Sequence, residues 1–111
     1  MDLSSEISDK IQIITVNDTR IDAAVAVQFK NDIRALADED IDRLILNLEH
    51  VAFLDSSGLG AVVATLKLLN DRCSFELAGL TETVAKVFRL TRMDMVFTIH
   101  ENAADAAHSQ Q

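Results

Sequence analysis

DSSGLG, residues Asp55–Gly60, lies between the apolar run Val51–Leu54 and a second apolar stretch, Ala61–Leu66. Asp and Ser are favoured at helix N-caps because their side-chain oxygens accept backbone N–H groups that have no partner within the helix. The pattern therefore predicts a tight polar turn and a helix that begins near Ser57. The hydroxyls of Ser56 and Ser57 then lie where the helix dipole favours negative charge, so a phosphate would be stabilised there.

The turn lacks the features of catalytic and nucleotide-binding loops. The P-loop spacing GxxxxGK[ST], the third glycine of a dinucleotide-binding loop and the nucleophile elbow GxSxG are all absent from the sequence. His50, His100 and His108 are too dispersed to suggest a metal site, and we interpret His50 as a solvated loop residue. We therefore predict no catalytic residue, no cofactor and no metal, and a protein that is not an enzyme.

The segments around the turn predict strands that alternate with helices. Strands are predicted at Lys10–Val16, Arg43–Leu48, Ser74–Ala78 and Met95–Ile99, with a short one at Ile21. Helices are predicted from Asp22 to Ala37, Ser57 to Asn70, Thr81 to about Thr91 and Ala103 to Ala107. This alternation indicates an α/β domain with a mainly parallel sheet. The nearly all-apolar strand Arg43–Leu48 should be central and covered on both faces, with the loop at Asp55 leaving the carboxyl edge of a central strand.

Composition limits the partners that the chain can have. Its 111 residues make one domain, 1–111, with a tail at about 107–111 that we expect to fray. The net charge of −8 disfavours binding to nucleic acid and to anionic membrane surfaces, and no apolar run approaches the ~20 residues of a membrane span. The single cysteine, Cys73, and the lack of a signal-peptide pattern fit a cytoplasmic protein.

The DSSGLG loop, in this strand-to-helix setting, resembles the signature loop of bacterial anti-sigma-factor antagonists, the single-domain STAS proteins. Arg20–Ala24 resembles the apolar-Asp-Ala step of that family, and Ser74–Leu80 with Val84–Leu90 resembles its later strand and helix. The resemblance implies a STAS-like α/β fold, with a small mixed or mainly parallel sheet of four to five strands and helices packed around it. Thr19 and Arg92 stand where the family often has Gly, and both departures bear on which partner is recognised.

The resemblance also implies a function. In that family the hydroxyl residue directly after the Asp is phosphorylated, which places the phosphoacceptor at Ser56. An anti-sigma factor with serine-kinase activity would bind the unphosphorylated protein and phosphorylate it with ATP, and a PP2C-type phosphatase would reverse the modification. The surface expected to meet this partner comprises Asp22, Asp55, Ser57, Gly58 and Leu59.

Other interpretations of the same residues stay open. Asp55, Ser56 and Ser57 are also what a purely structural helix cap requires. A STAS domain can instead be a constitutive subunit that docks onto a membrane transporter and is never phosphorylated. A third possibility is a sensor that holds a small anion at the helix N-terminus.

Overall fold

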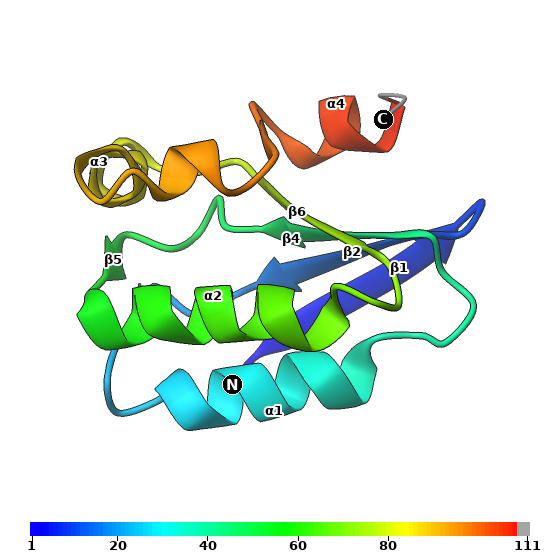
Figure 1. Cartoon of the computed structure of the whole chain (residues 1–111), viewed down its shortest axis with the longest axis horizontal. Coiled ribbons are helices and arrows are strands. Elements are labelled where there is room, and N and C mark those ends of the chain that lie inside the picture. Colours follow the sequence, from blue (N-terminus) through cyan, green and yellow to red (C-terminus); the bar gives the residue numbers. More distant parts are fainter. Residues whose placement is uncertain (109–111) are drawn as a thin grey trace.

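A five-stranded sheet forms the centre of the computed structural model, which describes residues 1–108 (Figure 1). Its strands, in spatial order, are β1 (Leu3–Ser8), β2 (Ile11–Val16), β4 (Arg43–Asn47), β6 (Ser74–Ala78) and β7 (Ile99–His100). Only the β1–β2 pair is antiparallel among these described strands, and the other neighbours run parallel. Two further short strands, β3 (Arg20–Ile21) and β5 (Phe53–Leu54), pair in parallel as a separate small sheet. The predicted mixed, mainly parallel sheet is confirmed.

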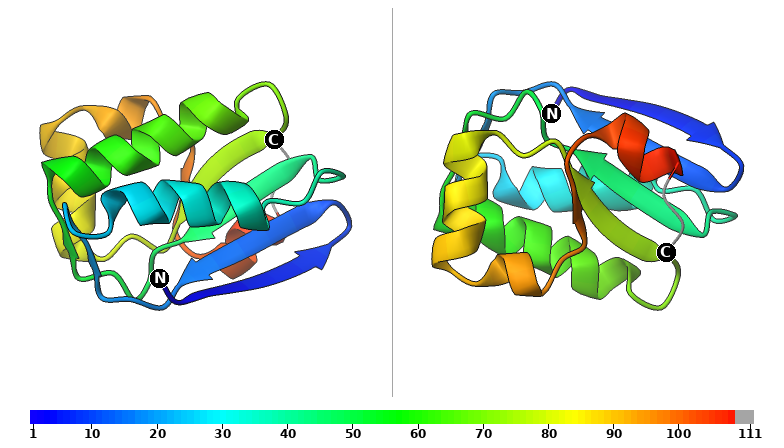
Figure 2. Two further views of the ribbon diagram at one scale, coloured as in Figure 1. Left: turned by 90° about the horizontal axis from the view of Figure 1, so that it is seen from below. Right: turned by 90° about the horizontal axis from the view of Figure 1, so that it is seen from above.

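Helices pack on both sides of this sheet (Figures 1 and 2). One face carries α1 (Ala26–Leu36) and α2 (Ser56–Leu69), which lie side by side. The other side carries α3 (Glu82–Leu90), at the end of the sheet, and the short α4 (Ala103–His108). A single 3₁₀ turn, η1 (Met93–Met95), follows α3.

The central strand β4 is buried on both faces, as its apolar sequence predicts. Leu44 and Leu46 point to the face covered by α1 and α2, where they join the main core with Ile14 and Leu77. Ile45 points to the other face and packs with Ala78 and with Ala106 of α4. Successive strand residues face opposite sides, so an apolar run without alternation fits only a strand with cover above and below.

The sequence patterns gave no signal for β1. Its residues, Leu3–Ser8, are mostly polar and exposed, because β1 is the edge of the sheet and contacts one neighbour. The strand owes its conformation to pairing with β2 across a two-residue turn, Asp9–Lys10. Both turn residues have positive φ, 53° and 66°, which is the hairpin geometry usually signalled by Asn-Gly or Asp-Gly.

Helix α1 begins at Ala26, so the prediction that Asp22 caps it is wrong. The Asp22 carboxylate accepts a hydrogen bond from the Ala24 N–H at 3.1 Å and forms a local turn, which delays the helix by one turn. The other end is held by Gln12 of β2, whose buried amide accepts from Asp38 N–H and donates to the Leu36 carbonyl. A strand side chain therefore satisfies backbone groups that the helix leaves unpaired.

The predicted strand Met95–Ile99 is wrong over most of its length. Residues 93–95 form η1, and strand pairing is confined to Ile99–His100 of β7. Arg92 has a left-handed backbone conformation, with a φ of 61°, which ends α3 and turns the chain. Met95 lies in η1 and is 81% exposed, so it does not lie in the sheet. Within the tail that we expect to fray, residues 107 and 108 are the end of α4, and residues 109–111 lie outside the described part of the chain.

Candidate functional site

Ser56 is the first residue of α2, directly after the N-cap Asp55. One Asp55 carboxylate oxygen accepts a hydrogen bond from the Gly58 N–H at 2.8 Å, which confirms the predicted cap and starts the helix one residue earlier than expected. The side chains of Ser56 and Ser57 are exposed. Asp55 supplies the cap by itself, and the Ser56 hydroxyl makes no hydrogen bond to any residue in the range 1–108. The hydroxyl therefore lies exposed at the helix N-terminus and does not hold the described part of the fold together.

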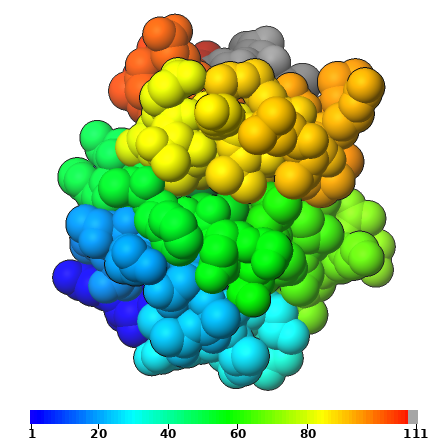
Figure 3. Space-filling view, turned by 90° about the vertical axis from the view of Figure 1, so that its left-hand side faces the viewer, coloured from blue at the N-terminus to red at the C-terminus, as the bar shows by residue number. Residues whose placement is uncertain are grey.

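The second carboxylate oxygen of Asp55 connects this turn to the β3–α1 loop. It accepts a hydrogen bond from the Ala23 N–H at 3.3 Å. Two segments that are more than thirty residues apart in the sequence, and that both contributed to the family resemblance, are thereby fixed side by side. Figure 3 shows residues 20–30 in blue to cyan against the start of α2 in green, with α3 in yellow next to it.

Gly58 has a structural role that the sequence interpretation missed. A Cβ atom at this position would lie 2.0 Å from the carbonyl oxygen of Ile21, so β3 can pass α2 only where the side chain is absent. The chain's own Ile21 carbonyl thus fills the space beside Gly58. Gly60 has nothing within 4 Å of the same position. Leu59 is half-buried against the core.

The loop at Asp55 follows β5 of the small sheet, so the prediction that it leaves the carboxyl edge of a central strand is wrong. After β4 the chain crosses to β5, which pairs with β3, and Asp55 follows β5. The N–H groups of Ala52 and Phe53 both donate to the Thr19 carbonyl, at 2.8 and 3.2 Å. The small sheet thus carries the turn away from the large sheet and brings it beside Asp22.

The charges around Ser56 are mostly negative. Asp55 precedes it, and Asp22 lies next to Ala23, to which Asp55 is bonded. Arg20, a cation on β3, is already engaged: its Nε lies 3.3 Å from an Asp22 carboxylate oxygen, and its guanidinium stacks 4.4 Å from the centre of the Phe53 ring. A phosphate on Ser56 would therefore add negative charge to an acidic surface on which Arg20 is already paired with Asp22.

A shallow groove of about 200 Å³ runs beside Ser57, between α1 and α2. Small and apolar side chains line most of it, and Lys30 adds a positive charge at one side. Val27 on its rim is 72% exposed, which is unusual for a large aliphatic side chain on a helix. The groove offers apolar contact area directly next to the exposed hydroxyls.

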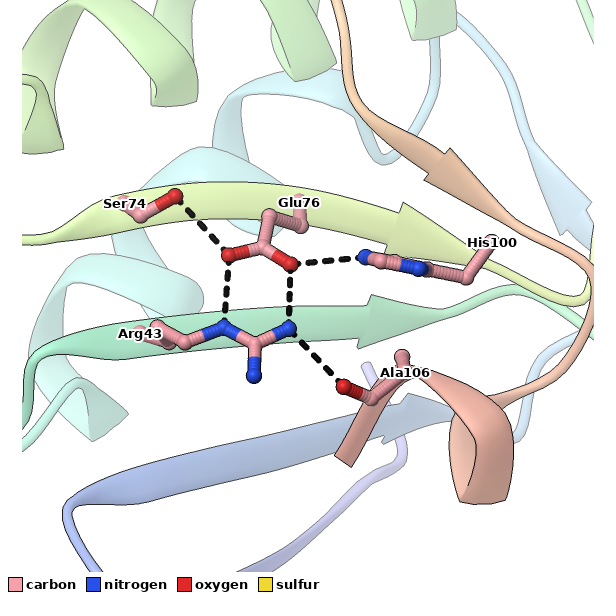
Figure 4. A network of polar contacts seen from close by, with 5 residues as sticks. All are labelled: Arg43, Ser74, Glu76, His100 and Ala106. Carbon is pink, nitrogen blue, oxygen red and sulfur yellow. Dashed lines mark hydrogen bonds and ion pairs between the residues drawn. The ribbon is translucent and has the colours of Figure 1, made fainter. Parts of the chain in front are cut away.

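A buried network of charged groups lies on the other face of the sheet, away from Ser56 (Figure 4). Glu76 of β6, which is 1% exposed, accepts bonds from Arg43 Nε at 2.9 Å and Nη2 at 2.6 Å, from Ser74 Oγ at 2.8 Å, and pairs with His100 Nε2 at 2.7 Å. Burial acts to raise the pKa of Glu76, but the hydrogen bonds from Arg43, His100 and Ser74 outweigh it and hold that pKa below its ordinary value.

Sequence reasoning treated His100 as an isolated histidine and missed this network. One signal was present: a glutamate in the middle of the otherwise apolar strand Ser74–Ala78 must find a partner when it is buried. The partner could not be identified, because Arg43 lies 33 residues away and only the parallel register of β4 and β6 aligns them.

The site thus combines an α/β domain, an exposed serine at a capped helix N-terminus and a second loop that Asp55 fixes beside it. The family model for the STAS domain matches residues 2–106. The chain therefore belongs to the STAS domain family.

Known proteins that resemble this chain include antagonists of anti-sigma factors. An anti-sigma-B factor antagonist of Staphylococcus aureus is 32% identical over 59 residues, which are 52% of this chain and 55% of the relative, so the match spans about half the length of each protein. The crystal structure of a putative anti-sigma factor antagonist from Thermotoga maritima superposes with a TM-score of 0.83 at 25% identity, over 96% of this chain and 92% of the other.

The same fold also occurs in a protein of a transporter family. A sulfate transporter family protein from Wolinella succinogenes has a TM-score of 0.77 over 91% of this chain and 84% of the other, with 14% identity. At that identity the likeness concerns the fold alone. Within residues 1–108, no helix has both the length and the apolar character needed to cross a bilayer.

Proposed function

We propose that this protein is an anti-sigma-factor antagonist whose binding to its partner is switched off by phosphorylation of Ser56. The observation that carries the proposal is the exposed Ser56 hydroxyl at the first position of α2, where Asp55 already caps the helix. The hydroxyl can be modified without removing any contact of the fold. Resemblance to the Staphylococcus aureus antagonist supports the same role.

The proposed partner is an anti-sigma factor with serine-kinase activity. It binds the unphosphorylated protein, transfers the γ-phosphoryl group of ATP to Ser56 and then dissociates. A PP2C-type phosphatase removes the phosphate and restores binding. In this scheme the protein is a cytoplasmic binding module and a phosphorylation substrate, not an enzyme.

The proposed docking surface consists of the α2 N-terminus and the loop that Asp55 attaches to it. The proposed interface residues divide by role: the carboxylates of Asp22 and Asp55 and the hydroxyl of Ser57 supply polar contacts, whereas Gly58 and Leu59 shape the surface from beneath. The groove beside Ser57 extends the surface between α1 and α2 with apolar area. A partner that covers this surface also buries the Ser56 side chain.

Two substitutions at Ser56 test whether charge is what breaks the complex. Ser56→Ala adds no charge and leaves the Asp55 cap intact, so its affinity for the anti-sigma partner should stay within about threefold of wild type. Ser56→Asp places a permanent charge in the interface and should weaken binding by about tenfold or more, which corresponds to ~1.4 kcal/mol. Isothermal titration at low and at high salt measures both.

Ser8→Asp is the matched control for these titrations. Ser8 is an exposed residue at the end of β1. The turn that joins β1 to β2 lies at the opposite side of the molecule from the start of α2 (Figure 1), so the variant gains the same charge at a distance. It should bind like wild type. Equal losses for Ser56→Ala and Ser56→Asp would show that the hydroxyl itself is the contact, which contradicts the electrostatic mechanism.

The constitutive transporter subunit remains the second candidate, because the fold also matches the Wolinella succinogenes sulfate transporter family protein. That function needs no modification of Ser56. Co-purification with a membrane transporter, together with unchanged affinity for it in both Ser56 variants, would favour this candidate over the switch.

A further inference from the structure

Helix α4 covers the middle of the sheet face opposite α1 and α2 (Figure 2, right). It has six residues, and its contacts to the apolar strip below are made by alanines, Ala103 and Ala106. The strip consists of Ile11, Ile13, Ile45 and Ala78. Alanine side chains bury little apolar area, so this packing holds α4 to the sheet weakly.

The two ends of α4 are stabilised in different ways. At its start, Asn102 Oδ1 accepts from the Asp105 N–H at 2.8 Å and Asn102 Nδ2 donates to Asp105 Oδ2 at 3.0 Å, so the first turn is capped by local residues. At its end, Arg43 Nη2 donates to the Ala106 carbonyl at 2.8 Å. Carbonyl groups in the last turn of a helix lack partners within it and favour a nearby positive charge. Arg43 thus adds a polar contact between the sheet and the last turn of α4 to the apolar contacts of Ala103 and Ala106.

Arg43 is in turn positioned by Glu76. The same Nη2 atom that reaches Ala106 also lies 2.6 Å from Glu76 Oε1, and Nε lies 2.9 Å from Oε2 (Figure 4). His100 and Ser74 complete the shell around the carboxylate. Without the negative charge of Glu76, Arg43 would lose the ion pair that orients its Nη2 atom toward the Ala106 carbonyl.

We propose that α4 is a latch, held closed by the Glu76 carboxylate through Arg43, which opens when that charge is lost while the rest of the fold stays intact. Opening uncovers the strip Ile11, Ile13, Ile45 and Ala78 on the face opposite α1 and α2. The device is independent of Ser56, so it adds a second state to the surface without changing the phosphorylation site.

The groups that face Glu76 set the pH range of the latch. They are Arg43 from β4, His100 from β7 and Ser74 from β6 itself, with the Cys73 thiol near enough to sense the carboxylate charge. From α4 the Ala106 carbonyl approaches Arg43, while Asp105 and His108 make no ion pair with Glu76 within residues 1–108. Since the pKa of Glu76 is lowered, the latch stays closed at neutral pH and opens as the pH falls through that lowered value.

Amide hydrogen exchange of the full chain at neutral pH tests the latch with Glu76→Gln and the matched control Glu82→Gln. Glu82 forms an exposed ion pair with Arg89 at 3.1 Å, so its variant loses a surface charge pair and leaves α4 untouched. In Glu76→Gln the amides of Ala106 and Ala107 should exchange at least about tenfold faster, with the amides of β4 unchanged. Glu82→Gln should match wild type at both places.

Unchanged α4 exchange in Glu76→Gln would overturn the proposal, and so would equal acceleration in α4 and β4, because Glu76 would then support only global stability. If Glu76→Gln does not fold, Arg43→Lys provides the second variant. Lys lacks the planar fork with which Arg43 pairs with both Glu76 oxygens, so its bond to Ala106 should weaken and faster exchange confined to α4 is again expected. Wild type at decreasing pH should lose α4 protection before β4 protection, and simultaneous loss would contradict the latch.

Discussion

Phosphorylation of Ser56 is expected to weaken the complex with the anti-sigma partner by at least about a hundredfold, or ~2.8 kcal/mol. A phosphate adds −1.5 to −2 charges at about neutral pH beside Asp55 and near Asp22. Arg20 of the neighbouring strand β3 already pairs with Asp22 and stacks on Phe53. An unpaired charge buried in an interface costs several kcal/mol, of the order of the ~8 kcal/mol that holds a micromolar complex together.

Calorimetric titration of the phosphorylated and unphosphorylated proteins measures this loss. Repulsion between exposed charges is screened by salt, whereas the cost of burying an unpaired phosphate is not. The loss should therefore shrink only in part between low and high ionic strength. A phosphorylated protein that binds as tightly as the unmodified one would contradict the proposed switch.

The phosphate should act on the surface and leave the fold unchanged. It meets a favourable helix dipole, worth about 0.3–1 kcal/mol at an exposed site, and the Ser56 hydroxyl holds no other described part of the chain. Changes in the amide spectrum should thus cluster around Asp22 and residues 54–62. Changes spread through β2 would indicate a conformational mechanism instead.

Replacing Gly58 by alanine should lower the free energy of unfolding by about 2–3 kcal/mol, the cost typical of overpacking in a core. The added Cβ would lie 2.0 Å from the Ile21 carbonyl oxygen, so either β3 or α2 must move. For a chain of this size the loss corresponds to a fall of about 10 °C in Tm. Because the same movement displaces the loop that bears Asp22, partner binding should weaken as well.

Gly60→Ala provides the control for this experiment. Gly60 lies in the same helix with nothing within 4 Å of an added Cβ, so the variant should gain about 0.5–1 kcal/mol from the better helix propensity of alanine. Thermal or urea unfolding measures the free energy of unfolding of the two variants and of wild type. Equal stability of the two proteins would contradict the assigned close approach of β3 to α2.

The parts of the fold predicted from sequence are those in which the local pattern and the packing agree. β4 and β6 are apolar strands at the centre of the sheet, and α2 has both a capping residue and an apolar face. The prediction failed where the structure depends on a contact that the local sequence pattern does not signal. β1 is a strand only because it pairs with β2, and α1 starts late because Asp22 binds a nearer backbone N–H.

The candidate site shows the same division. The Asp55 cap is a contact over three residues, so the sequence predicts it, and the structure confirms it at 2.8 Å. Two other features depend on segments brought together by folding: the fit of Gly58 against Ile21, and the pairing of Arg43 with Glu76 across two strands. No spacing rule reveals such contacts, because the intervening chain forms other elements.

Mapping of the phosphate after reaction with the cognate anti-sigma kinase and ATP tests the central claim most directly. Wild type, Ser56→Ala and Ser57→Ala should be compared, since Ser57 is the next residue, is also exposed and has the same side chain. The account predicts one phosphate, on Ser56, in wild type and in Ser57→Ala, and none in Ser56→Ala. Phosphate found chiefly on Ser57, or retained in Ser56→Ala, would contradict it.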